Sequence, residues 1–175
     1  MLLLAVALLC LGCGDGDEGE PFAIFHLETS VGPPAEHGDL RCGPPRPVCP
    51  GVVRQPPRRE FRYARTGEPA LTGDDIDRTS VRNATDPSTG MSLVLVDLTA
   101  AGTVAFARLT LEVARFGARD EAWHHVAIVV GDEIVAFPQV DYDAYPSGIT
   151  GAPAIQMVAA SAVDARDLVR RLRGG

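Results

Sequence analysis

Two repeating patterns of apolar and polar residues divide the second half of this chain into strands and helices. Alternation of the two residue classes predicts a β-strand at Met91–Leu98, because successive side chains of a strand point to opposite faces of a sheet. Apolar residues that recur every three or four positions predict a helix at Ala100–Phe116, whose buried face carries Phe106, Leu109, Val113 and Phe116. The same spacing predicts a C-terminal helix with an apolar face formed by Ala165, Leu168, Val169 and Leu172.

A β-hairpin is predicted where two apolar segments, His124–Val130 and Glu133–Phe137, flank the dipeptide Gly131-Asp132, since such dipeptides favour two-residue turns. Three further strands are expected at Phe22–Glu28, Phe61–Ala64 and Ala154–Val158. Each helix has one apolar face that must be buried. The sequence therefore predicts an α+β fold, with a small, mainly antiparallel sheet and both amphipathic helices packed on one face of it.

Three capping signals support these helix boundaries. Thr72 or Gly73 is expected to cap a short helical turn within Leu71–Ile76, and Thr99 is expected to cap the first long helix. Ser161 with Asp164 has the spacing of a capping box for the last helix.

Residues 32–59 are dominated by proline, glycine and arginine, which favours a long surface loop over a strand or helix. A loop of this length is a candidate functional surface. We expect Cys42 and Cys49 to form a disulfide across it if the chain is exported, because neighbouring cysteines pair in oxidising compartments. The alternative is a metal site that these cysteines form with His26 and His37, although their spacing is not that of common zinc motifs.

The N-terminus indicates export. Leu2–Leu11 is an apolar run of signal-peptide length, well below the roughly 20 residues that cross a bilayer as a helix. The Leu-Gly-Cys-Gly sequence around Cys13 resembles a lipobox, in which the thiol is acylated and the chain is cut before the cysteine. This predicts a lipoprotein signal peptide at residues 1–12, an acidic, glycine-rich tether at 13–21 and a single domain at 22–175. A plain secretory signal with incidental cysteines is the alternative.

The composition narrows the range of partners. The net charge of the 175 residues is -7, and all 16 basic residues are arginines. An acidic chain repels nucleic acid and anionic lipid, so neither is expected to bind through charge. The arginines of the last helix, at positions 166, 170, 171 and 173, gather on its polar face toward its C-terminal end, where they complement the helix dipole.

The sequence gives little evidence for catalytic or metal-binding groups. The sequence has no GxSxG or HExxH motif and no Cys-His signature in a suitable context. His124 and His125 are neighbours on a predicted strand and so point to opposite faces. Asp141 and Asp143 lack the further ligands of a calcium loop. We therefore expect no enzymatic activity and no cofactor or metal.

A set of short blocks occurs in one order along the chain between Leu71 and Gly175. They are Leu71-Thr72-Gly73 with Asp75 and Ile76, Phe106 with Leu109 and Thr110, Ala136-Phe137-Pro138, Gly148-Ile149, and Leu172 to Gly175. In this order they resemble the head subdomain of the first periplasmic domain of SecD, an accessory subunit of the bacterial Sec export machine. The resemblance covers roughly residues 22–175.

This resemblance implies a non-enzymatic, extracytoplasmic module that binds polypeptide and assists protein export. SecD continues into transmembrane helices, whereas no segment after Leu11 is long and apolar enough for one, so we expect a free-standing head. Its expected location is the outer face of the bacterial cell membrane, anchored there by lipid. The expected partners are an exported polypeptide, another envelope protein or the Sec translocon. The alternatives are a structural envelope lipoprotein and an extracytoplasmic hydrolase.

Overall fold

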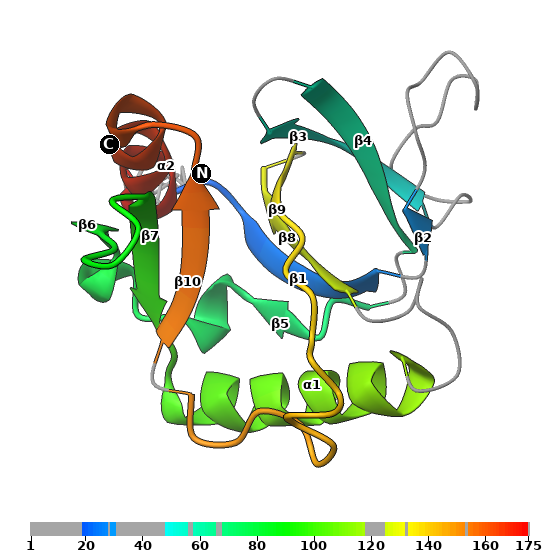
Figure 1. The fold of residues 1–175 in the computed structure, drawn as a ribbon. Coiled ribbons are helices and arrows are strands. Elements are labelled where there is room, and N and C mark those ends of the chain that lie inside the picture. The colour runs from blue at the N-terminus through cyan, green and yellow to red at the C-terminus, as the bar shows by residue number, and fades with distance from the viewer. Residues whose placement is uncertain are drawn as a thin grey trace, which may run out of the picture.

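The structure is a computed structural model that describes residues 19–27, 29–30, 48–55, 58–65, 68–117, 125–131, 133–152 and 154–174. Helices and antiparallel strands both contribute to it, which confirms the α+β class. The strands are divided among three antiparallel sheets (Figure 1), whereas the sequence pattern predicted one.

The largest sheet has four strands in the order β5 (Leu71–Thr72), β1 (Phe22–Leu27), β8 (His125–Val130) and β9 (Glu133–Ala136). The predicted hairpin is confirmed as β8 and β9, and Gly131 takes the positive φ of 62° that its turn requires. β8 is buried on both faces: Val126, Ile128 and Val130 contact the main core, while Ala127 and Val129 form a second small cluster.

The second sheet has three strands in the order β10 (Ala154–Ala159), β7 (Ser92–Asp97) and β6 (Arg82–Thr85). It confirms the strands predicted around residues 91–98 and 154–158. Helix α2 (Ala162–Arg173) packs against this sheet and buries Ala165, Leu168 and Leu172. The predicted cap of α2 is present, because the Ser161 hydroxyl accepts a hydrogen bond from the Asp164 amide at 3.2 Å.

The third sheet corrects the predicted loop at residues 32–59 only in its last part, because residues 48–55 and 58–59 lie in strands. Strand β3 (Val48–Gln55) pairs along its whole length with β4 (Arg58–Arg65), and β2 (Thr29–Ser30) pairs with the other edge of β4. Pro50 is tolerated because β3 is an edge strand, where a missing N–H group costs no ladder hydrogen bond on the outer side. Residues 31–47 lie outside the described residues.

Helix α1 (Ala100–Gly117) lies across one end of the two larger sheets (Figure 1). The hydroxyl of Thr99 caps it by accepting a hydrogen bond from the Gly102 amide at 3.0 Å. Leu109 and Val113 are fully buried, as their spacing predicted, but Phe116 is 38% exposed at the end of the helix. The ring of Phe116 lies 5.6 Å from that of His26 on β1.

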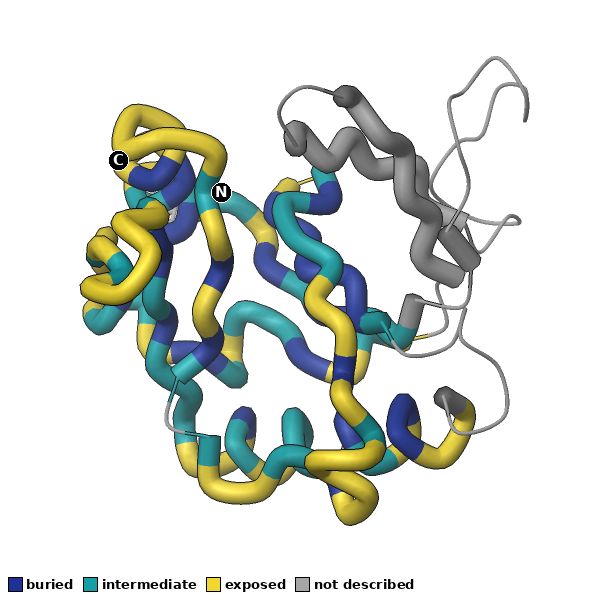
Figure 2. The backbone as a smooth tube through the Cα atoms, viewed as in Figure 1, coloured by how far each residue is buried: buried dark blue, intermediate teal, exposed yellow. Residues whose placement is uncertain are grey.

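The main core lies between the two larger sheets and is closed by both helices (Figure 2). It includes buried side chains from seven of the described helices and strands, among them Ile24, Val94, Leu109, Ile128, Met157 and Leu172. Glu20 and α2 meet at one corner, where the Glu20 amide donates to the Arg171 carbonyl at 2.7 Å. The two ends of the described chain therefore lie close together (Figure 1).

Candidate functional site

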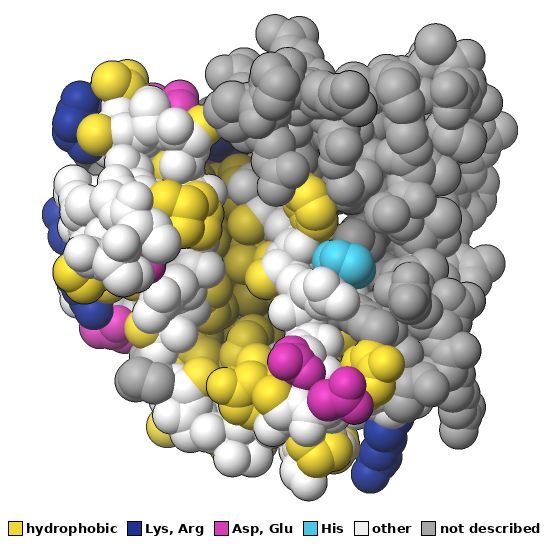
Figure 3. All heavy atoms as spheres, in the orientation of Figure 1, with side chains coloured by type: hydrophobic (Ala, Val, Ile, Leu, Met, Phe, Trp, Pro, Cys, Tyr) yellow, Lys and Arg dark blue, Asp and Glu magenta, His cyan; other side chains and the backbone are white. Residues whose placement is uncertain are grey.

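A hollow among the described residues lies between two edge strands, β9 and β10, with α2 at one end. We call it the β9–β10 groove. Its cavity volume is about 190 Å³, and Figure 3 shows it as a hydrophobic trough between the two sheets. Its lining is half apolar and half polar, formed by Val135, Val158, Ala159, Ala160 and Leu168 together with Glu133, Asp164, Asp167 and Arg171.

One wall of the groove is made by a β-bulge in β9. Ile128 pairs with Ala136 but Val129 pairs with Ile134, so Val135 is the extra residue on β9. A bulge bends its strand and redirects a side chain, and here Val135 lines the groove. The bulge also makes β9 a poor template for a further strand, because an irregular edge disrupts the ladder.

The opposite wall, β10, is regular. All six of its residues pair with β7, from Ala154 with Asp97 to Ala159 with Ser92. Among the described residues β7 is the only strand that pairs with β10, so the outer edge of β10 has no strand partner. Ile155 and Met157 point into the core, whereas the side chain of Val158 is 56% exposed. β10 thus combines an open backbone edge with an exposed apolar side chain.

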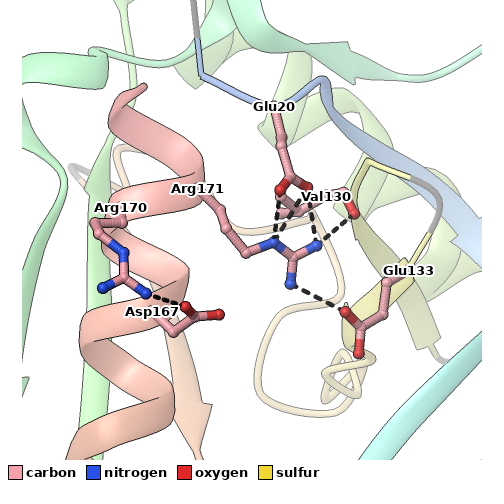
Figure 4. A network of polar contacts seen from close by, with 6 residues as sticks. All are labelled: Glu20, Val130, Glu133, Asp167, Arg170 and Arg171. Atoms are coloured by element: carbon pink, nitrogen blue, oxygen red, sulfur yellow. Dashed lines mark hydrogen bonds and ion pairs between the residues drawn. The ribbon is translucent and has the colours of Figure 1, made fainter. Parts of the chain in front are cut away.

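The end of the groove near α2 is fixed by Arg171. Its Nε donates to both carboxylate oxygens of Glu20 at 3.1 Å, and its Nη1 donates to Glu133 Oε2 at 3.0 Å (Figure 4). Its Nη2 donates to the carbonyl of Val130 at 3.1 Å and to Glu20 Oε2 at 3.0 Å. The guanidinium therefore joins α2, the β8–β9 hairpin and the segment before β1.

The burial and the pKa of Arg171 both reflect this network of hydrogen bonds. The side chain of Arg171 is 23% exposed. Hydrogen bonding to Glu20 raises the pKa of Arg171 above its ordinary value, partial burial opposes the shift, and the bond to Glu133 adds to it. The sequence interpretation placed Arg171 with the solvated arginines of the polar face, and the structure corrects this. The partner Glu20 lies 151 positions away in the sequence, so the spacing of residues within the helix could not predict this ion pair.

Two of the blocks that carried the family resemblance, Phe106 to Thr110 and Gly148-Ile149, contact each other along α1. The hydroxyl of Thr110, fully buried, accepts a hydrogen bond from the Ile149 amide at 2.8 Å and donates to the Phe106 carbonyl at 2.9 Å. Gly148 lies so near α1 that an added Cβ would be 2.7 Å from the Ala107 carbonyl oxygen. The predicted capping of residues 73–75 by Thr72 is also confirmed. These contacts stabilise the fold, and none of the residues that make them lines the groove.

Only some of the site residues predicted from the sequence belong to the described part of the chain. Cys13, Cys42, His37 and His124 lie outside the described residues, and Cys49 is described only as a backbone position in β3. Lipid attachment at Cys13 and a disulfide between Cys42 and Cys49 therefore stay predictions.

The part of the chain that the structure describes was searched for clusters of metal ligands and for helices able to span a membrane. No group of three or more His, Cys, Asp or Glu side chains there is placed to hold a metal ion. The carboxylate of Asp141 instead accepts hydrogen bonds from the amides of Asp143 and Ala144, both at 3.0 Å, as in an ordinary turn. No helix in the same described residues has the length and apolarity needed to span a membrane.

Comparisons with known proteins identify the fold. No family model matches the chain, and no curated protein matches it significantly. A crystal structure of SecDF in a super-membrane-facing form matches with a TM-score of 0.54 and 18% identity, over 89% of this chain and 19% of that one. A second structure, of SecDF described as a membrane component that enhances protein export, matches with a TM-score of 0.52 and 17% identity, over 97% of this chain and 72% of that one.

These similarities confirm the predicted SecD/SecDF-like fold. The chain spans 19% of the length of the first SecDF chain that it matches.

Proposed function

We propose that this chain is a non-enzymatic, extracytoplasmic module that binds extended polypeptide in the β9–β10 groove and assists protein export. The observation that carries the proposal is the edge of β10, which no described strand covers, beside a hollow lined by both apolar and charged side chains. An extended peptide can add to such an edge through main-chain hydrogen bonds, and its alternate side chains then enter neighbouring apolar pockets.

The shape of the groove favours an extended chain over a small compact ligand. The bulge at Val135 and the exposed Val158 place apolar surface on both walls along the strand direction. Natural proteins usually cover or charge an open, regular strand edge to prevent association. The edge of β10, which no strand among the described residues covers, lies next to exposed apolar surface and is therefore a candidate interaction surface. The role in export is supported by the fold, which resembles that of a membrane component that enhances protein export.

The location and anchor are part of the same proposal. Acylation at Cys13 would hold the domain at the outer face of the membrane, with residues 13–21 as the tether. Palmitate labelling of the wild type and of Cys13→Ala tests the anchor, and labelling that persists in the variant would refute it. Thiol counting before and after reduction tests the disulfide between Cys42 and Cys49.

A binding experiment tests the groove directly. Fluorescence anisotropy with labelled, extended apolar peptides should show saturable binding to the purified protein. Val158→Asp should weaken it about five- to thirtyfold, because about 1–2 kcal/mol of apolar contact is lost and a charge is introduced.

Val163→Asp is the matched control. Val163 lies on α2, is 65% exposed and does not line the groove, so its replacement should leave the dissociation constant unchanged. Absence of saturable binding, or an equal loss of affinity in the two variants, would refute the proposal. Cross-linking in cells then tests the role: recovery of exported chains or translocon subunits supports export, whereas a single fixed envelope partner supports the structural alternative.

A further inference from the structure

The charges that line the β9–β10 groove are unbalanced. Three carboxylates, those of Glu133, Asp164 and Asp167, line the groove together with one guanidinium, that of Arg171. The groove thus has a formal excess of two negative charges beside its apolar surface. A ligand that carried a positive charge would complement this excess.

The guanidinium of the groove lining, that of Arg171, already binds other groups of the protein. Arg171 binds Glu20 through Nε and Nη2, and it binds Glu133 through Nη1 at 3.0 Å. Its remaining Nη2 contact is the Val130 carbonyl. Four of the five N–H groups of this guanidinium therefore donate to acceptors among the described residues, and it is poorly placed to bind a carboxylate of a ligand.

The two acids on α2 are available at the rim. The Asp164 carboxylate accepts a hydrogen bond from the Ser161 hydroxyl at 2.8 Å, and no arginine among the described residues forms an ion pair with it. Asp167 pairs with Arg170, whose side chain is 71% exposed. A solvent-exposed pair of this kind contributes little and exchanges readily. Asp164 and Asp167 are three positions apart, so they lie on the same side of the helix.

We propose, on the basis of the peptide-binding function proposed above, that the groove selects extended apolar segments that carry a lysine or arginine. The apolar side chains of the segment contact Val135, Val158 and Leu168, and its basic side chain lies against Asp164 and Asp167. The net charge of -7 adds a longer-range attraction for basic segments. The same charges disfavour an apolar segment that carries aspartate or glutamate.

Three peptides of about twelve residues test this, with the same apolar sequence and Lys, Gln or Glu at one central position. Anisotropy at low salt should rank their affinities in the order Lys, Gln, Glu, with about five- to tenfold between the first and last. The difference should shrink at high salt because exposed charges are screened. In the double variant Asp164→Asn, Asp167→Asn the Lys and Glu peptides should bind within twofold of each other, since asparagine keeps an acceptor for Ser161.

Glu112→Gln is the control for the loss of a carboxylate outside the groove. Glu112 is an exposed carboxylate on α1 and does not line the groove, so this variant should keep the full preference. Peptides that bind equally well, a preference that survives in the double variant, or an equal loss of preference in Glu112→Gln would overturn the charge selection and leave peptide binding intact. Failure of all three peptides to bind would overturn the proposed function as well.

Discussion

Replacing Thr110 by valine tests whether the fold depends on the contact between α1 and the turn at Gly148. Valine keeps the branched shape of threonine but removes the hydroxyl. That hydroxyl is fully buried, accepts from the Ile149 amide at 2.8 Å and donates to the Phe106 carbonyl at 2.9 Å. Because Ile149 would keep an N–H group with no acceptor at this position, we expect the free energy of unfolding to fall by about 1–3 kcal/mol.

Thr103→Val in the same helix provides the control. The Thr103 hydroxyl also donates to a carbonyl four residues earlier, that of Thr99, at 3.0 Å. Thr103 is only half-buried, and its hydroxyl accepts no hydrogen bond from a distant segment among the described residues. We therefore expect Thr103→Val to change the stability by about 0.5 kcal/mol or less, as most surface substitutions do.

Urea denaturation measures both variants, through a lower midpoint with an unchanged slope. Amide hydrogen exchange gives a local check, because the Ile149 amide should lose protection in Thr110→Val and keep it in Thr103→Val. Equal stability losses in the two variants would show that the contact with Ile149 contributes nothing, and the reasoning would then be wrong.

Two further substitutions test the scaffold by the same denaturation assay. Arg171→Met should cost about 1–2 kcal/mol, because it leaves Glu20 and Glu133 without their shared cation, whereas Arg170→Met removes only an exposed pair and should cost under about 0.5 kcal/mol; equal losses would contradict the network. Gly148→Ala should cost about 2–4 kcal/mol, because φ is +78° and the new Cβ would lie 2.7 Å from α1 backbone atoms. Gly151→Ala is the control: Gly151 also has a positive φ of +69°, but no atom lies within 4 Å of the new Cβ, so a loss of about 1–2 kcal/mol is expected. Equal losses of stability in the two variants would show that α1 can move away from the new Cβ of Gly148→Ala at no cost.

Local patterns in the sequence predicted most of the individual elements. The alternation around residues 91–98 and the three- and four-residue spacing of α1 depend only on neighbours in the chain, and both were confirmed. The caps at Thr72, Thr99 and Ser161 were confirmed for the same reason, since each partner lies within three residues.

Long-range features were missed because no local pattern specifies them. The division into three sheets depends on pairings such as Phe22 with Val130, which join distant parts of the chain. β3 was missed because Pro50 and Gly51 oppose a strand on average, although an edge position tolerates them. The groove was missed because it needs both the bulge at Val135 and the open edge of β10.

The meeting of Glu20 with the C-terminal end of α2 has an architectural consequence. The backbone hydrogen bond from the Glu20 amide to the Arg171 carbonyl is 2.7 Å long. Arg78 reinforces this contact by donating a hydrogen bond to the Glu20 carbonyl at 3.2 Å. A domain whose entry and exit coincide can be inserted into a surface loop of a larger protein without spreading the ends of that loop. The same proximity would allow a circular permutation, in which a short linker connects Glu20 to the end of α2 and the chain begins at another turn.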